Sequence, residues 1–330
     1  MESRPFPRTP FSASVVGLGT WQLGADWGDV SESDARGVLE ASAEAGVTFF
    51  DTADVYGDGR SEQIVGRFVA DHADAGLTVA TKMGRRDEQV PENYVEPRFR
   101  EWLDRSRRNL GVDTLDLVQL HCPPSAVIDD DATYDVLDRL VADGVITAYG
   151  VSVETADQAL SAIARPNVAS IQIILNAFRM KPLDEVLPAA EAAGVGIIAR
   201  VPLASGLLSG KYGMDTEFAE DDHRNYNRDG SAFDVGETFS GVDYATGVGA
   251  AQEFARLVDS ELADVTPAQA ALAWACQQPG VTTVIPGARN VDQARSNAAA
   301  GSVPELPQSL LDGVADLYDR RIREQVHGRW

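Results

Sequence analysis

The sequence predicts an α/β protein in which eight strand–helix units close into a single (β/α)8 barrel. Eight short apolar segments alternate along the 330 residues with segments of helical spacing. Regular alternation of this kind favours a parallel sheet, and eight units fit a closed barrel, for which about 250 residues is typical. Because the chain shows no internal repeat, linker or low-complexity segment, we expect residues 1–330 to form one domain.

The strands are expected where β-branched and aromatic residues form short runs between turn signals. The segment 47–50, Val-Thr-Phe-Phe, has no polar alternation, which is typical of a strand buried on both faces of a parallel sheet. Gly57 and Gly59 then turn the chain toward a helix. In chain order, the expected strands cover residues 14–19, 47–50, 77–82, 115–121, 145–152, 168–175, 195–201 and 281–287.

Helices are expected between the strands, where a capping residue, a helical apolar period and a glycine stop follow one another. Ser31 and Ser61 are the expected caps of the first two helices. The helix at 97–110 is expected to bury one stripe of side chains, namely Phe99, Trp102, Leu103, Ser106 and Leu110. The expected helices cover residues 31–46, 61–72, 97–110, 132–143, 155–164, 183–193, 251–262, 266–278 and 291–300.

Residues 203–247 are glycine-rich and acidic and follow neither period. A loop of this length in a compact domain is usually a lid or a binding loop. We therefore expect a long functional loop after the seventh strand, and extra helices at the C-terminal side of the barrel.

Composition and charge narrow the possible functions. No segment approaches eighteen apolar residues and the N-terminus lacks an apolar signal region, so we expect a cytoplasmic protein without a membrane partner. The net charge of −23 argues against nucleic acid as a partner, since phosphate binding needs a basic surface. Cys122 and Cys276 lack metal-ligand spacing, so we expect neither a disulfide framework nor a metal site.

Titratable side chains follow three consecutive strands of the predicted barrel. Asp51 ends the second strand with Tyr56 just beyond it, Lys82 ends the third and His121 ends the fourth. In a barrel these strand ends are neighbours and carry the active site. A tyrosine hydroxyl has a pKa of about 10, so an adjacent Lys82 ammonium, held by Asp51, would make Tyr56 a better proton donor. His121 could orient a carbonyl oxygen or share the proton with Tyr56.

Each of these residues has a structural explanation when it is taken alone. Asp51 could cap a turn, Tyr56 could pack on a loop, and Lys82 could be a solvated strand end. His121 could be a core histidine. Their joint placement on adjacent strand ends favours a catalytic site.

Six segments, in a common order along nearly the whole chain, make the sequence similar to the aldo-keto reductases. They are DTADVYG at 51–57, TK at 81–82, VQLHCPP at 118–124, YGVS at 149–152, PLASGLLSGKY at 202–212 and IPGARN at 285–290. The resemblance implies an NADPH-dependent TIM barrel that reduces a small aldehyde or ketone to the alcohol. It implies that Tyr56 is the general acid, that Asp51 and Lys82 tune it, and that His121 orients the carbonyl.

The same resemblance implies where the cofactor would bind. Ser152 and Gln172 would hold the nicotinamide carboxamide. Arg289 would hold the 2′-phosphate, because guanidinium matches phosphate as a fork, and NADP is therefore expected over NAD. The loop after the seventh strand would wrap the pyrophosphate through Pro202, Leu203, Ser205, Gly206, Leu207 and Lys211. The other expected cofactor contacts are Gly19, Thr20, Trp21, Asp51, Arg200, Gly287, Gln293 and Asn297.

An aromatic wall is expected on the substrate side of this site. It would combine Trp21 and Trp27 with Tyr56 and His121. The GLGT segment at 17–20 resembles the start of a dinucleotide fingerprint, but the third glycine is missing, so we interpret it as a strand end.

Three positions depart from the pattern of many aldo-keto reductases. Val153 stands where an asparagine would add a carboxamide contact, and Gly287 stands where some branches have a cationic residue. Arg200 stands where a tyrosine stacks under the nicotinamide. A guanidinium can also stack on a ring, but its positive charge would disfavour NADP⁺ relative to NADPH.

Two other functions stay open. Barrels of this family can act as NADP-binding, redox-sensing regulatory subunits with slow turnover, and an apolar patch on the outer helices would support that role. A Schiff-base lyase or aldolase that uses Lys82 is the other alternative, and it would leave Arg289 and the loop at 202–212 without a purpose.

Overall fold

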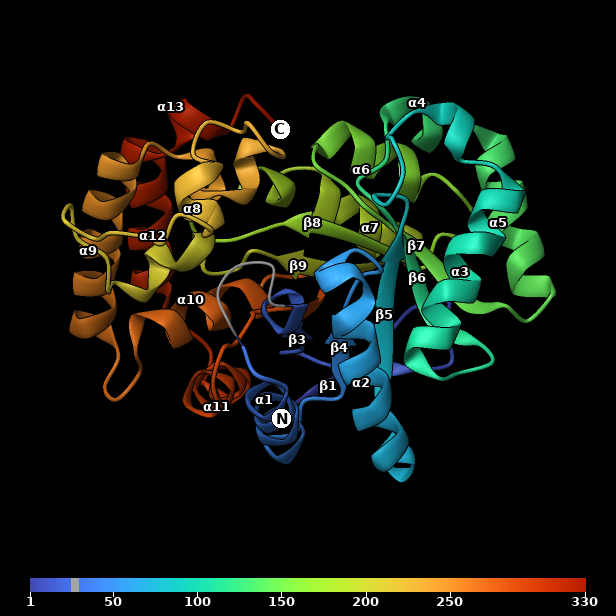
Figure 1. Ribbon diagram of the computed structural model, residues 1–330. Coiled ribbons are helices and arrows are strands. Elements are labelled where there is room, and N and C mark those ends of the chain that lie inside the picture. Colours follow the sequence, from blue (N-terminus) through green and yellow to red (C-terminus); the bar gives the residue numbers. More distant parts are fainter. Residues whose placement is uncertain (25–29) are drawn as a thin grey trace.

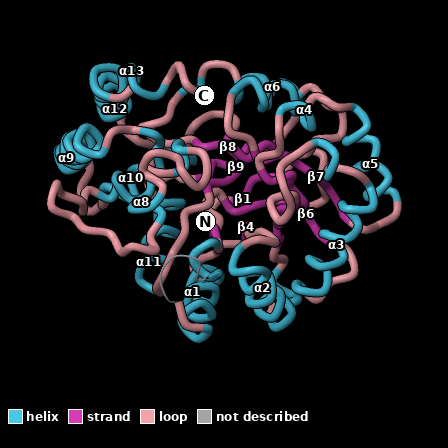
Figure 2. The backbone as a smooth tube through the Cα atoms, turned by 45° about the horizontal axis from the view of Figure 1, so that its top comes forward, coloured by secondary structure: helices cyan, strands magenta, loops and turns pink. Residues whose placement is uncertain are grey.

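The computed structural model describes residues 1–24 and 30–330, and its centre is a barrel of parallel strands. The strands follow one another in the sheet in chain order, from β3 to β10. Figures 1 and 2 show them in the middle of the molecule with the helices around them. The barrel strands are β3 (Leu18–Gly19), β4 (Phe49–Asp51), β5 (Thr78–Met83), β6 (Leu115–His121), β7 (Ile146–Ser152), β8 (Ser170–Ile174), β9 (Gly196–Arg200) and β10 (Val281–Val284).

Backbone contacts beside β3 and β10 close the barrel. Parallel bridges join Val16 to Val284 and Gly19 to Gly287. A Cβ atom on Gly19 would come 2.9 Å from the carbonyl oxygen of Ile285, so glycine is needed where these two segments approach each other. The predicted eight-stranded barrel is therefore confirmed.

A short antiparallel hairpin precedes the barrel, and the sequence did not predict it. It pairs β1 (Ser3–Pro5) with β2 (Ser12–Ser14). Phe6, between the two strands, is buried with its ring 5.6 Å from that of Phe49. Arg8 donates hydrogen bonds to carbonyl groups that precede β8 and β9. The hairpin thus covers the amino end of the barrel, opposite the ends that carry the predicted site, and residue 14 belongs to it rather than to the first barrel strand.

The helices cover the outside of the barrel, and α12 packs beside α9 (Figure 1). The predicted stripe of α3 is confirmed, since all five of its residues are buried. No helix in the described ranges is long and apolar enough to cross a membrane. The α-helices are α1 (Glu32–Glu44), α2 (Arg60–Asp71), α3 (Glu96–Leu110), α4 (Ser125–Ile128), α5 (Asp131–Ala142), α6 (Ala156–Ile163), α7 (Val186–Ala193), α8 (His223–Tyr226), α9 (Tyr244–Glu261), α10 (Pro267–Cys276), α11 (Val291–Ala299), α12 (Gln308–Arg321) and α13 (Arg323–Val326).

Ser61 does not cap α2, so that prediction was wrong. The N-cap is Gly59, at φ +93°, and Ser61 lies inside the helix, fully buried. Its hydroxyl donates to Thr20 Oγ1 at 2.8 Å and accepts from Thr52 Oγ1 at 2.9 Å. Because a buried hydroxyl needs such partners, Ser61 ties α2 to the ends of β3 and β4.

The segment 203–247 contains more helix than the sequence predicts. It includes a 3₁₀ turn at Ala204–Ser209 and the short helix α8, and α9 already begins at Tyr244 rather than at residue 251. The glycines that argued against helix there have a packing role. A Cβ atom on Gly247 would come 2.8 Å from the side chain of Leu207.

Candidate active site

The four predicted catalytic residues lie together at the carboxyl end of the barrel. Asp51 is the last residue of β4, Lys82 lies near the end of β5, and His121 is the last residue of β6. Tyr56 begins the 3₁₀ turn that follows β4. Because β4, β5 and β6 are neighbours in the sheet, the fold brings the four side chains to one place.

Lys82 is at the centre of this group. Its side chain is buried, and its ammonium group forms an ion pair with Asp51. The same nitrogen donates to the carbonyl oxygen of Thr52 at 2.8 Å and lies 3.4 Å from the hydroxyl oxygen of Tyr56. Lys82 therefore connects the buried carboxylate to the hydroxyl group.

Two glutamine side chains hold the other oxygen of the Asp51 carboxylate. Gln119 Nε2 donates to Oδ2 at 3.1 Å, and Gln172 Nε2 donates to it at 2.8 Å. A buried carboxylate needs such partners. Gln119 was not predicted as a site residue, although it lies two residues before His121 on the same face of β6. Gln172 was predicted to contact the cofactor, but its amide nitrogen donates to Asp51.

Burial and neighbouring charges set the protonation of the site. Burial raises the pKa of Tyr56 above its usual value, and the Lys82 ammonium opposes this effect without cancelling it. Burial alone would lower the pKa of Lys82, but Asp51 and Tyr56 together outweigh burial and the pKa is raised. Burial, together with three neighbouring cationic side chains, lowers the pKa of His121 well below its usual value. At neutral pH, Tyr56 is therefore protonated, Lys82 is charged and His121 is uncharged.

Aromatic side chains surround Tyr56. Its ring meets the His121 ring edge-on with centroids 6.0 Å apart, and Trp21 stacks against it at 6.1 Å. His223 lies against Trp21, with ring centroids 5.2 Å apart. The structure thus places Trp21 beside the two catalytic rings, while Trp27 lies outside the described residues.

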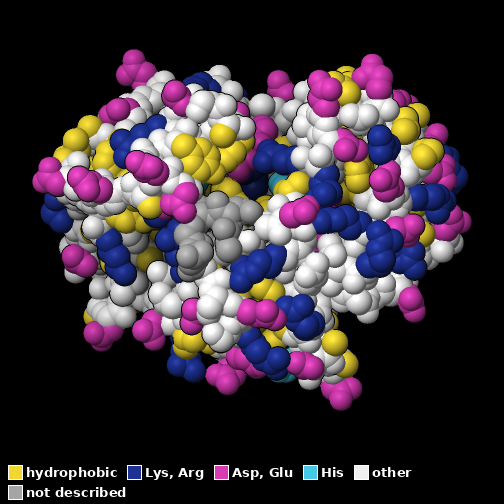
Figure 3. Space-filling model, viewed as in Figure 1, with side chains coloured by type: hydrophobic (Ala, Val, Ile, Leu, Met, Phe, Trp, Pro, Cys, Tyr) yellow, Lys and Arg dark blue, Asp and Glu magenta, His cyan; other side chains and the backbone are white. Residues whose placement is uncertain are grey.

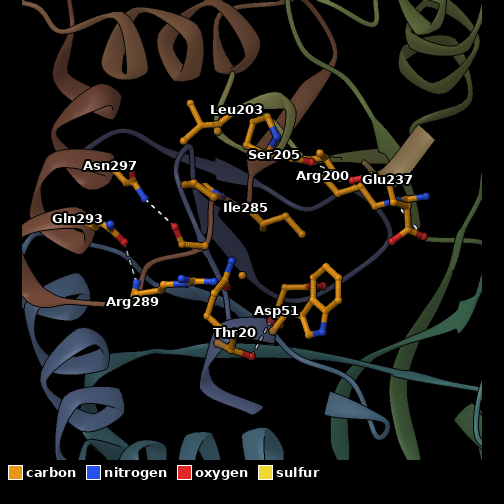
Figure 4. A pocket seen from close by; sticks show the side chains of 18 of the residues that line it. Thr20, Asp51, Arg200, Leu203, Ser205, Glu237, Ile285, Arg289, Gln293 and Asn297 are labelled. Carbon is orange, nitrogen blue, oxygen red and sulfur yellow. Dashed lines mark hydrogen bonds and ion pairs between the residues drawn. The ribbon is translucent and has the colours of Figure 1, made fainter. Parts of the chain in front are cut away.

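A cavity of about 570 Å³ opens beside these rings, and Figure 3 shows the surface hollowed near the centre of this face. In Figure 4, Gln293 and Asn297 lie on one side of the cavity, and Arg200 and Glu237 lie on the other. Leu207 is not among the lining residues and is fully buried. The predicted site residues that line the cavity are Gly19, Thr20, Trp21, Asp51, Tyr56, His121, Ser152, Gln172, Arg200, Pro202, Leu203, Ser205, Gly206, Lys211, Gly287, Arg289, Gln293 and Asn297.

The chain bends sharply where it enters this cavity after β9. Val201, Ala204 and Ser205 have φ values of +53°, +48° and +54°, and this region strains a β-branched residue such as Val201. Gly206 follows at φ +94°, and a Cβ atom there would come 2.5 Å from the Tyr212 hydroxyl. Such strain persists only where the surrounding structure holds the backbone, so the loop has one defined shape.

A family model described as the aldo/keto reductase family matches residues 15–319. The chain belongs to the aldo/keto reductase family. The match covers the whole barrel, and it confirms the resemblance that the six sequence segments indicate.

Relatives of this aldo/keto reductase family member match over nearly their whole lengths. An uncharacterised oxidoreductase of Mycobacterium tuberculosis is 32% identical over 96% of this chain and 93% of its own. A probable voltage-gated potassium channel subunit beta of Oryza sativa subsp. japonica is 29% identical over 95% of each chain. The solved structure of a glycerol dehydrogenase from Gluconobacter oxydans is 30% identical, with a TM-score of 0.79 over 97% of this chain and 96% of that one.

This family member also has a partly buried network of charged side chains, of which only Arg200 was predicted from the sequence. Arg200 donates to the Glu154 carboxylate at 2.8 Å and to the Val153 carbonyl at 3.2 Å. It lies 3.5 Å from Oε1 of Glu237. Arg85 donates to both carboxylates, at 3.1 and 3.2 Å. Arg85 and Glu154 each lie two residues beyond a strand end and could have been suspected, whereas Glu237 lies in the segment 203–247 without a local signal.

The network resembles a metal site in one respect. Cys122, Glu154 and Glu237 offer possible ligand atoms within 4.8 Å of one another. Both carboxylates, however, already pair with guanidinium groups. We therefore interpret the cluster as a partly buried ion-pair network, because a cation would have to displace the arginines.

Proposed function

We propose that this chain catalyses the reversible reduction of an aldehyde or ketone to the alcohol, with NADPH as the reductant. The position of Tyr56 carries the proposal. Its protonated hydroxyl belongs to a cavity-lining residue and lies 3.4 Å from the charged Lys82. A proton donor at this place suits a carbonyl oxygen that becomes basic as hydride reaches the carbon. A cytoplasmic location stays a prediction.

The residues at the other end of the cavity fit a phosphorylated dinucleotide. Arg289 and Lys211 both line the cavity, and their charges suit the 2′-phosphate and the pyrophosphate of NADPH. Asn297 donates to the Gly287 carbonyl at 3.0 Å, and Gln293 accepts from the Arg289 amide at 2.9 Å. These bonds shape the segment that carries Arg289, so the cation is presented on a defined backbone.

NADPH bound in this cavity would supply the hydride for the carbonyl carbon, and the chain supplies the proton. The Tyr56 hydroxyl donates its proton to the carbonyl oxygen, and the Lys82 ammonium stabilises the phenolate that results. Asp51 keeps Lys82 charged and in place.

His121 positions the carbonyl oxygen. Its Nδ1 atom is buried without a hydrogen-bond partner in the described part of the chain, whereas Nε2 is not buried in this way. Because His121 is uncharged, one ring nitrogen carries the proton. With the proton on Nε2, His121 donates a hydrogen bond to the carbonyl oxygen and does not compete with Tyr56 as an acid.

A redox-sensing regulatory subunit is the second candidate, because the rice relative is named as a channel subunit. A docking surface on the outer helices would support this role. The large apolar side chains that are exposed in the described ranges lie on several separate elements, which favours the enzyme. They are Met1, Val95, Val112, Val141, Met214 and Tyr226.

The location of Lys82 argues against a Schiff-base lyase or aldolase. Its side chain is 1% exposed and does not belong to the cavity lining. A Schiff base needs an uncharged amine that can reach the substrate, whereas Asp51 keeps this lysine charged.

The proposal is tested by NADPH oxidation with a panel of small aldehydes, including a nitrobenzaldehyde, on the parent and on Tyr56→Phe. NADPH affinity is followed by tryptophan fluorescence. We expect turnover in the parent that falls by orders of magnitude in Tyr56→Phe while NADPH affinity is retained. Tyr134→Phe is the matched control, because this hydroxyl binds the Ile128 carbonyl away from the cavity. Tight NADPH binding without turnover of any carbonyl would favour the regulatory role.

A further inference from the structure

Glu237 is a charged residue of the cavity that the reaction above does not use. It ends the 3₁₀ turn Val235–Glu237 and lines the cavity. In Figure 4 it lies beside Arg200, across the cavity from Gln293 and Asn297. Its ion-pair partner Arg200 lies 3.8 Å from the Sγ atom of Cys122, the residue that follows His121. The Glu237 carboxylate therefore belongs to the end of the cavity that also holds His121.

Several contacts hold Glu237 in position. Its Oε1 atom accepts from Arg85 Nη2 at 3.2 Å and lies 3.5 Å from Arg200 Nη1. Its backbone carbonyl accepts from the Ser205 hydroxyl at 3.0 Å. Asp234, just before the turn, accepts from Trp330 Nε1 at 3.0 Å. Side chain and backbone are thus both anchored, which is what a residue that recognises a substrate requires.

No N–H or hydroxyl group in the described part of the chain donates to the second carboxylate oxygen, Oε2, and this oxygen is not one of the buried unpartnered atoms. Burial alone would raise the pKa of Glu237, but Arg200, Arg85 and a hydrogen bond from the Glu154 carboxyl group together outweigh burial and lower it. Oε2 is therefore an oxygen of an ionised carboxylate that is open to the cavity, and it can only accept hydrogen bonds.

The surrounding charges indicate what kind of donor fits. Glu154 and Glu237 face Arg85 and Arg200, and burial together with Glu237 raises the pKa of Glu154, so the two carboxyl groups carry no excess of negative charge over the two guanidinium groups. The cluster therefore does not require an ammonium group to balance it. A carboxylate on the substrate would meet Oε2 with the same charge, which costs free energy. A neutral hydroxyl group suits the position best.

We propose that Glu237 is a specificity residue, and that its Oε2 atom accepts a hydrogen bond from a hydroxyl group of the substrate. The preferred substrates are then hydroxylated aldehydes and ketones rather than simple alkyl carbonyls. This inference rests on the proposed carbonyl reduction and adds a substrate class to it. A site that binds a substrate hydroxyl rejects the analogue without one, because the acceptor is then left unpaired.

The test compares glyceraldehyde with propanal, which have the same number of carbon atoms and differ in two hydroxyl groups. The ratio of their kcat/KM values is measured for the parent, Glu237→Gln and Glu237→Asp. Because the hydration of each aldehyde in water is the same for every variant, it cancels between variants. Glu220→Gln is the matched control, since Glu220 is an exposed residue of the same loop. NADPH affinity is measured for all four proteins.

We expect kcat/KM of the parent to be at least tenfold higher for glyceraldehyde than for propanal. In Glu237→Gln this ratio should fall at least tenfold. Glu237→Asp keeps the charge but draws the carboxylate back, so its kcat/KM ratio should lie between those of the parent and Glu237→Gln. Glu237→Asp tests the proposal even if Glu237→Gln does not fold. A parent that reduces both aldehydes equally well, or an unchanged ratio in both variants, overturns the role of Glu237 alone. A parent that reduces neither aldehyde overturns the proposed function and this inference with it.

Discussion

The ammonium nitrogen of Lys82 lies 3.4 Å from the hydroxyl oxygen of Tyr56 and forms an ion pair with Asp51 on its other side. The same cation thus pairs with a buried carboxylate and contacts the hydroxyl group that donates the proton. The stability of the site and its chemistry are linked through this side chain, and substitutions can separate the two.

Lys82→Met should lower both the free energy of unfolding and kcat. Removing one partner of a buried ion pair costs about 3–5 kcal/mol, because the remaining charge stays buried. The double variant Asp51→Asn with Lys82→Met should therefore lose less stability than the sum of the two single variants. Its kcat should stay low, at least about 100-fold below the parent. Urea unfolding and steady-state kinetics measure both quantities, and additive losses of stability would contradict the coupling.

Arg289→Gln should weaken the binding of NADPH more than that of NADH. The guanidinium group suits the 2′-phosphate, which only NADPH has, and the loss of such a charged contact costs about 1.5–3 kcal/mol, roughly 10- to 100-fold in affinity. Lys211→Gln is the contrast, because the pyrophosphate is common to both cofactors and both affinities should fall alike. Fluorescence titration gives the four dissociation constants. If Arg289→Gln lost the same affinity for NADPH as for NADH, Arg289 would not contact the 2′-phosphate.

Glu154→Gln should weaken NADP⁺ binding relative to NADPH by several-fold. Arg200 is expected to disfavour the oxidised ring, but Glu154 and Glu237 pair with its charge in this structure. Removing one carboxylate exposes that charge to the cationic nicotinamide, whereas Arg200→Tyr should act in the opposite direction. The ratio of the two dissociation constants measures the effect, with the exposed Glu191→Gln as the control. A ratio equal to that of the parent in both variants would show that the network does not influence the nicotinamide site.

Asp54→Asn should raise the free energy of unfolding relative to the parent. This gain should be larger at pH 8 than at pH 5. Both carboxylate oxygens of Asp54 are buried without hydrogen-bond partners in the described ranges, and burial raises its pKa from 3.8 to about 7. The folded state keeps this proton while the unfolded state releases it. Stability is therefore lost as the pH rises from about 4 to about 7, by up to about 4 kcal/mol.

Urea unfolding of the parent and of Asp54→Asn at the two pH values measures this difference. Asp74 lies in an exposed turn, and Asp74→Asn is the control. Its effect on stability should be the same at both pH values. An Asp54→Asn variant whose advantage is the same at pH 5 and pH 8 would show that Asp54 has the same pKa in the folded and unfolded states.

Local patterns predicted the barrel because each of its units is encoded over a few residues. Apolar runs, caps and glycine stops indicate strands and helices without knowledge of the fold, and the buried stripe of α3 follows from helical spacing. Ser61 was misassigned for the opposite reason. Whether a serine caps a helix or bonds inside it depends on Thr20 and Thr52, which only the folded chain brings near.

The sequence by itself determined which groups stand at the ends of consecutive strands. Asp51, Lys82 and His121 could be placed together because a parallel barrel aligns its carboxyl ends. Only the tertiary structure decided the contacts of Arg85 and Glu237, which come from separate loops, and the commitment of Gln172 to Asp51. The reason is physical. Strand order follows from local spacing, whereas the pairing of buried charges depends on distances between segments remote in the chain, which packing alone sets.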